Sequence, residues 1–149
     1  MSKRIDPSTV VTVVGTRYPK PHDEPCLRRE RKKLGDLANL TQFGVNLLRL
    51  PPGVWSSQRH WHTSEDEFVF VIQGEVTLVT NDGDEVLRSG DCAGFKANDP
   101  NGHHLQNRSQ HDAIVLEVGG RDPRDGALYS DIDMRTDGDN YVRRNGTPL

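Results

Sequence analysis

The spacing of short apolar segments between Phe43 and Val118 is the feature that most constrains how this chain folds. Segments such as "FGVNLLRL", "EFVFVIQG" and "DAIVLEVGG" alternate apolar and polar residues, and turn signals separate them about every eight to twelve residues. A period of two is typical of strands with one buried face, and this region contains no helical period of useful length. The pattern predicts an all-β, mainly antiparallel barrel or jelly roll over residues 43–118.

A second feature supports this prediction. Asn81-Asp82-Gly83 lies at the centre of "EVTLVTNDGDEVLRSGD", and it predicts a β-hairpin because these residue types tolerate a positive φ. We interpret Gly74, Gly83, Gly90 and Gly94 as turn and bulge positions. All 149 residues fit one domain, and a barrel this small would gain stability from arms packed over it or from a homodimer.

The barrel is flanked by two irregular, polar arms, an N-terminal arm (1–42) and a C-terminal tail (119–149), each expected to pack on the barrel or on a partner subunit. The β-branched run Val10–Val14 predicts a short strand that pairs with a sheet edge. The run "RRERKKLGDL" from Arg28 to Leu37 is the densest positive segment. Because it has no interleaved aromatic residues, we interpret it as a solvated surface segment.

Charge and composition exclude several classes of partner. The net charge is −3 and the sequence pI is near 6.0, so we expect neither nucleic acid nor an anionic membrane as a partner. The N-terminus lacks the apolar core of a secretory signal, no apolar run approaches the ~18 residues of a membrane span, and Cys26 and Cys92 lie far apart. We therefore expect a cytoplasmic protein.

The stretch "HWHTSEDEF", residues 60–68, indicates the chemistry. Residues i and i+2 of a strand share a face, so His60 and His62 would lie side by side, and Glu67 would begin the next strand after a turn. "NGHHLQN" offers His103 and His104 as a third imidazole. Such a set suits Mn, Fe, Co, Ni, Cu or Zn with positions left open to water. The alternative is an exposed polar pair. Four further residues are interpreted as solvated turn or exposed residues: Glu65, Asp66, His22 and His111.

The segment Gly53–Gly74 reads G-x6-H-x-H-x4-E-x6-G and resembles the first motif of the cupin superfamily. Gly90-Asp91 leading to His103, with Asn107 four residues later, is similar to the second motif, although Lys96-Ala97-Asn98 replaces the usual Pro-x-Gly. The resemblance extends to small single-domain bacterial cupins called sugar-phosphate-isomerase-like. It implies a homodimer with one divalent transition metal per chain (Zn, Mn, Fe or Ni), and its ligands would be His60, His62, Glu67 and His103. His104 remains the alternative to His103.

Strand alternation also suggests residues that bind the ligand. Counting from the histidines places Gln58 and Asn107 on the ligand face, and Arg49 is either an inward cation for an anionic substrate or an edge residue. Trp61 faces the other way and is expected to pack or to lie at a dimer interface.

Two classes of function follow from these residues. The first is a metal-dependent enzyme that acts on a small polar or anionic metabolite by isomerase, lyase or dioxygenase chemistry. The second is a non-catalytic ligand-binding or sensor protein. The absence of an output domain favours the enzyme, and a basic residue in the pocket beside an open metal position would favour an acid or phosphate substrate.

Overall fold

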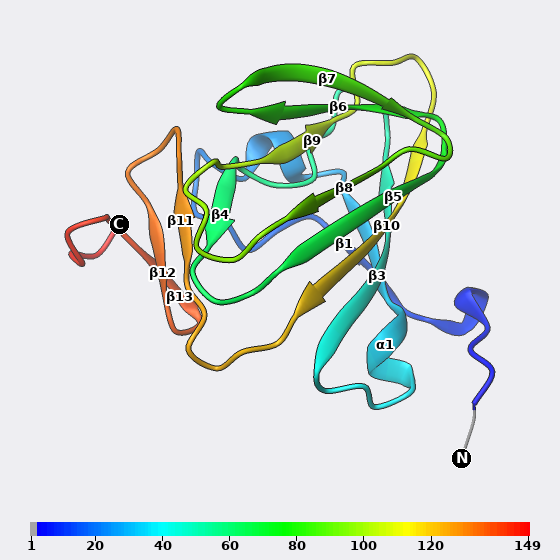
Figure 1. Ribbon diagram of the computed structural model, residues 1–149, viewed down its shortest axis with the longest axis horizontal. Coiled ribbons are helices and arrows are strands. Elements are labelled where there is room, and N and C mark those ends of the chain that lie inside the picture. The colour runs from blue at the N-terminus through cyan, green and yellow to red at the C-terminus, as the bar shows by residue number, and fades with distance from the viewer. Residues whose placement is uncertain (1–2) are drawn as a thin grey trace.

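The computed structural model describes residues 3–149 and is built almost entirely from antiparallel strands (Figure 1). The helical segments are η1 (Pro7–Thr9), η2 (Glu24–Cys26) and α1 (Leu34–Leu37). The strands are β1 (Thr12–Val14), β2 (Glu30–Lys33), β3 (Phe43–Leu50), β4 (His60–His62), β5 (Glu67–Gln73), β6 (Glu75–Thr80), β7 (Gly83–Arg88), β8 (Cys92–Phe95), β9 (His104–Gln106), β10 (Ala113–Gly120), β11 (Ala127–Tyr129), β12 (Arg135–Asp137) and β13 (Asn140–Val142). The all-β prediction is confirmed. Among the described residues, no helix is long and apolar enough to cross a membrane.

The largest sheet has the strand order β1-β2-β3-β10-β5-β8 and forms one wall of the barrel. Its central strand β10 places Val115 opposite Leu48 of β3 on one side and Val71 of β5 on the other. These three side chains are fully buried, as alternation with a period of two requires. Residues of the opposite phase on β5, such as Phe68 and Phe70, are exposed on the outer face.

The opposite wall is the three-stranded sheet β7-β6-β9. The hairpin predicted at Asn81-Asp82-Gly83 is confirmed, because Thr80 of β6 pairs with Gly83 of β7, and Gly83 has a φ of 115°. Inward side chains of this sheet, including Val76, Leu78 and Leu105, join the buried residues of the large sheet in one apolar cluster. The barrel interior is therefore a packed core.

Both arms contain more regular structure than their composition suggests. β11 of the C-terminal tail pairs with β4, in the order β13-β12-β11-β4, so that Tyr129 lies opposite His60 and Ala127 opposite His62 (Figure 1). A second apolar cluster, with Tyr18, Cys26 and Met134 at its centre, packs both arms together. The tail is thereby fixed beside the histidine strand.

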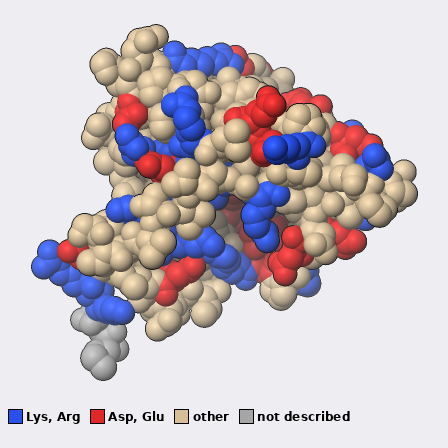
Figure 2. All heavy atoms as spheres, turned by 180° about the vertical axis from the view of Figure 1, so that it is seen from behind, with Lys and Arg blue, Asp and Glu red and all other residues tan. Residues whose placement is uncertain are grey.

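The N-terminal arm extends the large sheet. The strand predicted in Val10–Val14 is present as β1, and it pairs with β2 of the same chain. The prediction of a solvated segment at Arg28–Leu37 is wrong in part, because Arg29 and Gly35 are buried and Arg31 is half-buried in a salt bridge with Glu117. On the face seen from behind, Lys and Arg side chains are mixed with Asp and Glu (Figure 2).

Candidate metal centre

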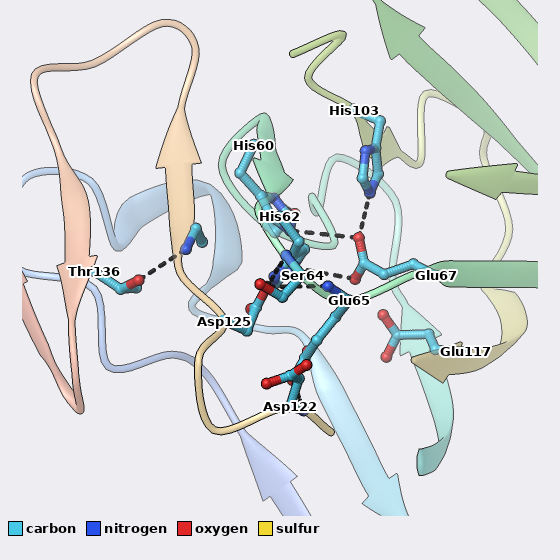
Figure 3. A network of polar contacts seen from close by, with 12 residues as sticks. His60, His62, Ser64, Glu65, Glu67, His103, Glu117, Asp122, Asp125 and Thr136 are labelled. Carbon is cyan, nitrogen blue, oxygen red and sulfur yellow. Dashed lines mark hydrogen bonds and ion pairs between the residues drawn. The ribbon is translucent and has the colours of Figure 1, made fainter. Parts of the chain in front are cut away.

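Two strands and one loop bring the predicted ligands together (Figure 3). His60 and His62 lie on β4 with their ring centroids 4.9 Å apart, and Glu67 begins β5. His103 precedes β9 and reaches the cluster because its backbone forms an antiparallel bridge with that of His60. The Nε2 atoms of His103, His62 and His60 lie 2.6, 3.4 and 3.9 Å from the carboxylate oxygens of Glu67. Three imidazoles therefore converge on one carboxylate.

Hydrogen bonds at the far side of two rings fix their orientation. Nδ1 of His60 lies 2.8 Å from the Gln58 carbonyl oxygen, and Nδ1 of His62 lies 2.7 Å from Oδ2 of Asp125. Since a carbonyl oxygen and a carboxylate only accept, each Nδ1 carries the hydrogen. In the neutral ring, Nε2 then keeps its lone pair toward Glu67, which is the tautomer a metal ligand needs.

His103 and His104 are separated by their surroundings. His103 stacks on Phe95, with centroids 3.6 Å apart and planes 1° apart, and its Nε2 faces Glu67. His104 turns away: its Nδ1 donates to the Ser57 carbonyl oxygen, and its Nε2 lies 3.0 Å from the Gln106 amide nitrogen. The structure thus brings His103, not His104, into the cluster.

The cluster shifts the pKa of its members in different directions. Burial lowers the pKa of His60 to about 4, so this ring is neutral at pH 7. Burial also disfavours the charged form of His62, but contacts with Glu67 and Asp125 outweigh it and raise its pKa to about 9. For Glu67, hydrogen bonds from His103 and His62 outweigh burial and hold the pKa well below its usual range. Metal binding therefore competes with a proton on His62.

The donor set fits a divalent transition metal. Donor atoms of His60, His62 and Glu67 lie within 4.8 Å of one another, and His103 contacts the same carboxylate. Three neutral nitrogen donors and one carboxylate are a typical set for Mn, Fe, Ni or Zn. A second group within 4.8 Å, formed by His62, Glu65 and Asp125, is explained by hydrogen bonds, since Oδ1 of Asp125 accepts from the backbone N–H groups of Ser64 and Glu65.

None of the three predicted substrate-binding residues lines a cavity beside the cluster. Arg49 is on the outer side of the sheet, in salt bridges with Glu30 and Asp112. The amide of Gln58 donates to the His22 carbonyl oxygen, and that of Asn107 donates to the carbonyl oxygens of Leu50 and His111. Gln58 and Asn107 lie just outside regular strands, where alternation no longer fixes direction. In the structure, all three side chains therefore bond to other groups of the protein.

Two cavities of similar size flank the cluster. The arm-side cavity, about 560 Å³, is lined by the N-terminal arm, β2, β3, β10 and Tyr141 of β13. The hairpin-side cavity, about 540 Å³, is lined by the β6–β7 hairpin, β8 and the loop at residues 96–101. They share one wall, formed by His62, Glu65, Glu67, Phe95 and His103. A ligand in either cavity would reach the cluster.

Sequence reasoning missed three residues at this site. Asp125 lies 63 positions from His62 and comes from the tail. Phe95 stacks on His103. Glu65 was expected to be a solvated turn residue, but it is half-buried, and burial raises its pKa. In the sequence, a local signal existed only for Phe95, which lies in phase with Ala93 on β8.

Comparison with known proteins agrees with this geometry. The family model described as a cupin domain matches residues 46–119. A sugar phosphate isomerase of the cupin superfamily from Silicibacter pomeroyi is 42% identical, with a TM-score of 0.94 over 99% of this chain and 96% of its own. A protein from Acidithiobacillus ferrooxidans, provisionally named a sugar phosphate isomerase, is 28% identical, with a TM-score of 0.73 over 82% of this chain and 80% of its own.

The polyketide cyclase RemF from Streptomyces resistomycificus shares the fold, with 17% identity and a TM-score of 0.66 over 82% of this chain and 81% of its own. No curated protein sequence matches the chain significantly. The shared fold, the matched domain and the extensive similarity to the Silicibacter protein together show that the chain belongs to the cupin superfamily.

Proposed function

We propose that this cupin is a metal-dependent enzyme that acts on a small, polar, anionic metabolite, with isomerisation of a sugar phosphate as the favoured reaction. The observation that carries the proposal is the convergence of three imidazole nitrogens on Glu67, which lies in the wall that two cavities share. The name of the protein from Silicibacter pomeroyi, which is similar over 99% of this chain, supports the choice of reaction. The fold alone would not support this choice of reaction, because cupin-like barrels host many chemistries.

His60, His62, His103 and Glu67 would hold the metal, which supplies Lewis-acid polarisation of a carbonyl oxygen or a bound water with a lowered pKa. Asp125 keeps the His62 ring in place through its Nδ1–H. The arms help to enclose the site, since Tyr18 and Tyr141 line the arm-side cavity.

Isomerisation also needs a group that moves a proton between carbon atoms. Glu65 fits this role within the proposal. Its side chain lines both cavities, and one of its carboxylate oxygens lies within 4.8 Å of a ring nitrogen of His62. Burial raises its pKa, although a hydrogen bond from the Asp122 backbone opposes the shift. A raised pKa makes this carboxylate a stronger base than an unperturbed glutamate.

The test combines metal analysis with turnover. Protein purified without chelator should contain near one transition metal per chain, and His60→Ala should lose it. The matched control is His111→Ala, which removes an exposed histidine outside the cluster and should keep the metal. Incubation with a panel of aldose and ketose phosphates, followed by NMR, should show interconversion.

One further variant separates catalysis from binding. Glu65→Gln should keep the metal and lose at least about 100-fold in turnover, as expected for removal of a general base. Metal and ligand binding with no turnover across the panel would support the non-catalytic binding protein instead. A chain that binds no metal under any condition would refute both the centre and the enzyme.

A further inference from the structure

The arm-side cavity has an unusual charge distribution. Outside the wall that it shares with the hairpin-side cavity, the arm-side cavity is lined by five cationic residues and by one carboxylate, that of Glu117. The cations come from the arm, from β2 and from the segment after β10: Arg17, Arg29, Arg31, Lys33 and Arg121. Arg31 is paired with Glu117 through Nε at 2.9 Å. Nη2 of Arg121 lies 3.9 Å from Oδ1 of Asp36. Arg17, Arg29 and Lys33 give this part of the cavity an excess of positive charge.

Arg29 is the most informative of these residues. This residue is only 8% exposed. Its Nη1 and Nη2 atoms donate to the backbone carbonyl oxygens of Ser56 and Gly15 at 2.6 and 2.8 Å. Nε is buried without an acceptor. Within residues 3–149, no carboxylate lies within 4.0 Å of this guanidinium. Two of its five N–H donors are therefore satisfied, and its charge has no paired anion.

A buried cation without a counter-ion is costly, because burial removes its hydration and nothing replaces it. The pKa of Arg29 is accordingly lowered, first by burial and then by the charge of Arg31. Two other residues that line the cavity also carry a buried polar atom without a partner: Asn46 at Oδ1 and His103 at Nδ1. An anionic group would compensate the charge of Arg29, and a hydroxyl group of the same ligand could donate to Oδ1 of Asn46, which only accepts.

The cavity connects this positive region to the candidate metal centre. Arg29 holds the carbonyl oxygen of Ser56, and the hydroxyl of the next residue, Ser57, lies 3.3 Å from Nδ1 of His60. His60, His62, Glu67 and His103 line the same cavity. A ligand with an anionic group at one end would thus place its other end against the cluster.

We infer that the arm-side cavity holds a ligand by a phosphate or carboxylate group, bound by Arg29 with help from Arg17 and Arg31. Arg29 supplies the buried, preorganised donors, and Arg17 adds an exposed guanidinium that makes no hydrogen bond or salt bridge with another described residue. Guanidinium groups suit this role because their planar donors match the oxygens of both anions. The inference rests on the proposed function only in naming which end of the ligand faces the metal.

The experiment measures anion binding in metal-free protein, so that failure of the metal centre does not affect it. Inorganic phosphate and acetate are titrated separately by calorimetry or by NMR of the backbone amides. Arg29→Gln should weaken binding of the preferred anion by at least about tenfold, the usual size of one charge-assisted hydrogen bond. Arg17→Ala should weaken it about threefold. Its exposed side chain makes no described polar contact, so the fold should be unaffected.

The matched control is Arg108→Ala, which removes an exposed arginine paired with Asp84 on the hairpin side and should leave anion binding unchanged. Preference for phosphate would identify a phosphate monoester as the ligand class, and preference for acetate would identify a carboxylic acid. The inference would be overturned if the wild type bound neither phosphate nor acetate. It would also be overturned if all three variants bound the preferred anion as tightly as the wild type. The metal analysis described above would stand in either case.

Discussion

The arm-side and hairpin-side cavities share a wall but differ in charge. Beyond that wall, the arm-side lining has five cations and one carboxylate, whereas the hairpin-side lining has four carboxylates, Asp82, Asp84, Glu85 and Asp99, and one cation, Lys96. Their volumes are nearly equal, so size does not distinguish them. Because charge of one sign concentrates ions of the other, an anionic ligand should use the arm side.

The difference has a structural origin. The hairpin-side cavity is lined by strands between residues 43 and 118 and by their turns, whereas the arm-side cavity also needs β1, β2 and β13, which come from the two arms. The arms therefore add the positive lining to a cluster that the barrel alone assembles. Under the proposed function, the barrel would supply the metal ligands and the arms would select the ligand that reaches them.

The largest expected effect concerns the shared wall. The pKa of His62 in the fold, about 9, lies above its ordinary value of 6.5, so in metal-free protein its contribution to stability is complete below pH 6.5 and is lost as pH rises through 9. This difference between the two pKa values corresponds to roughly 3 kcal/mol in the free energy of unfolding. Urea unfolding of metal-free protein between pH 6 and 10 should show this loss, and His62→Gln should show much less of it. Parallel curves for the two proteins would contradict the charged His62–Glu67 pair.

A smaller effect is expected from the tail. Asp125→Asn removes the acceptor that orients the His62 ring, and loss of such an outer partner typically weakens metal affinity about 10- to 100-fold. Competition with a chromophoric chelator measures this change. Asp122→Asn is the matched control, because its side chain pairs with the exposed Arg124 in the same segment and should leave affinity unchanged. Equal effects of the two variants would mean that the tail acts through stability alone.

The smallest effect should come from the hairpin side. Glu85→Gln neutralises an exposed carboxylate of that lining, and solvent and salt screen such charges strongly. Phosphate affinity, measured as for the arginine variants, should change by less than about twofold. A tenfold gain would show that the two cavities are electrostatically coupled and would remove the distinction drawn between them.

The sequence predicted the part of the site that strand geometry controls. His60 and His62 share a face because they are two residues apart on one strand, and Glu67 begins the next strand, so their proximity follows from local spacing. The choice between His103 and His104 did not follow from local spacing. It depends on the backbone bridge between His103 and His60 and on the stacking with Phe95, which involve distant segments.

Residues outside regular strands were the least predictable. Gln58 and Asn107 were assigned to the ligand face by counting, yet their amides satisfy backbone carbonyl oxygens. Arg29 lies in a run of charges typical of a surface, yet it is buried and donates hydrogen bonds to the carbonyl oxygens of Ser56 and Gly15. In each case the decisive partner is a backbone group from another part of the chain, and residue type carries no information about it.

The sequence by itself determined an antiparallel barrel and the proximity of His60, His62 and Glu67, because a period of two and a short turn fix which side chains share a face. Only the tertiary structure decided that Asp125 orients His62 and that Arg29 is buried beside the cluster. Both depend on where the arms pack. That packing is set by the apolar cluster around Tyr18, Cys26 and Met134, whose members are spread over more than a hundred positions.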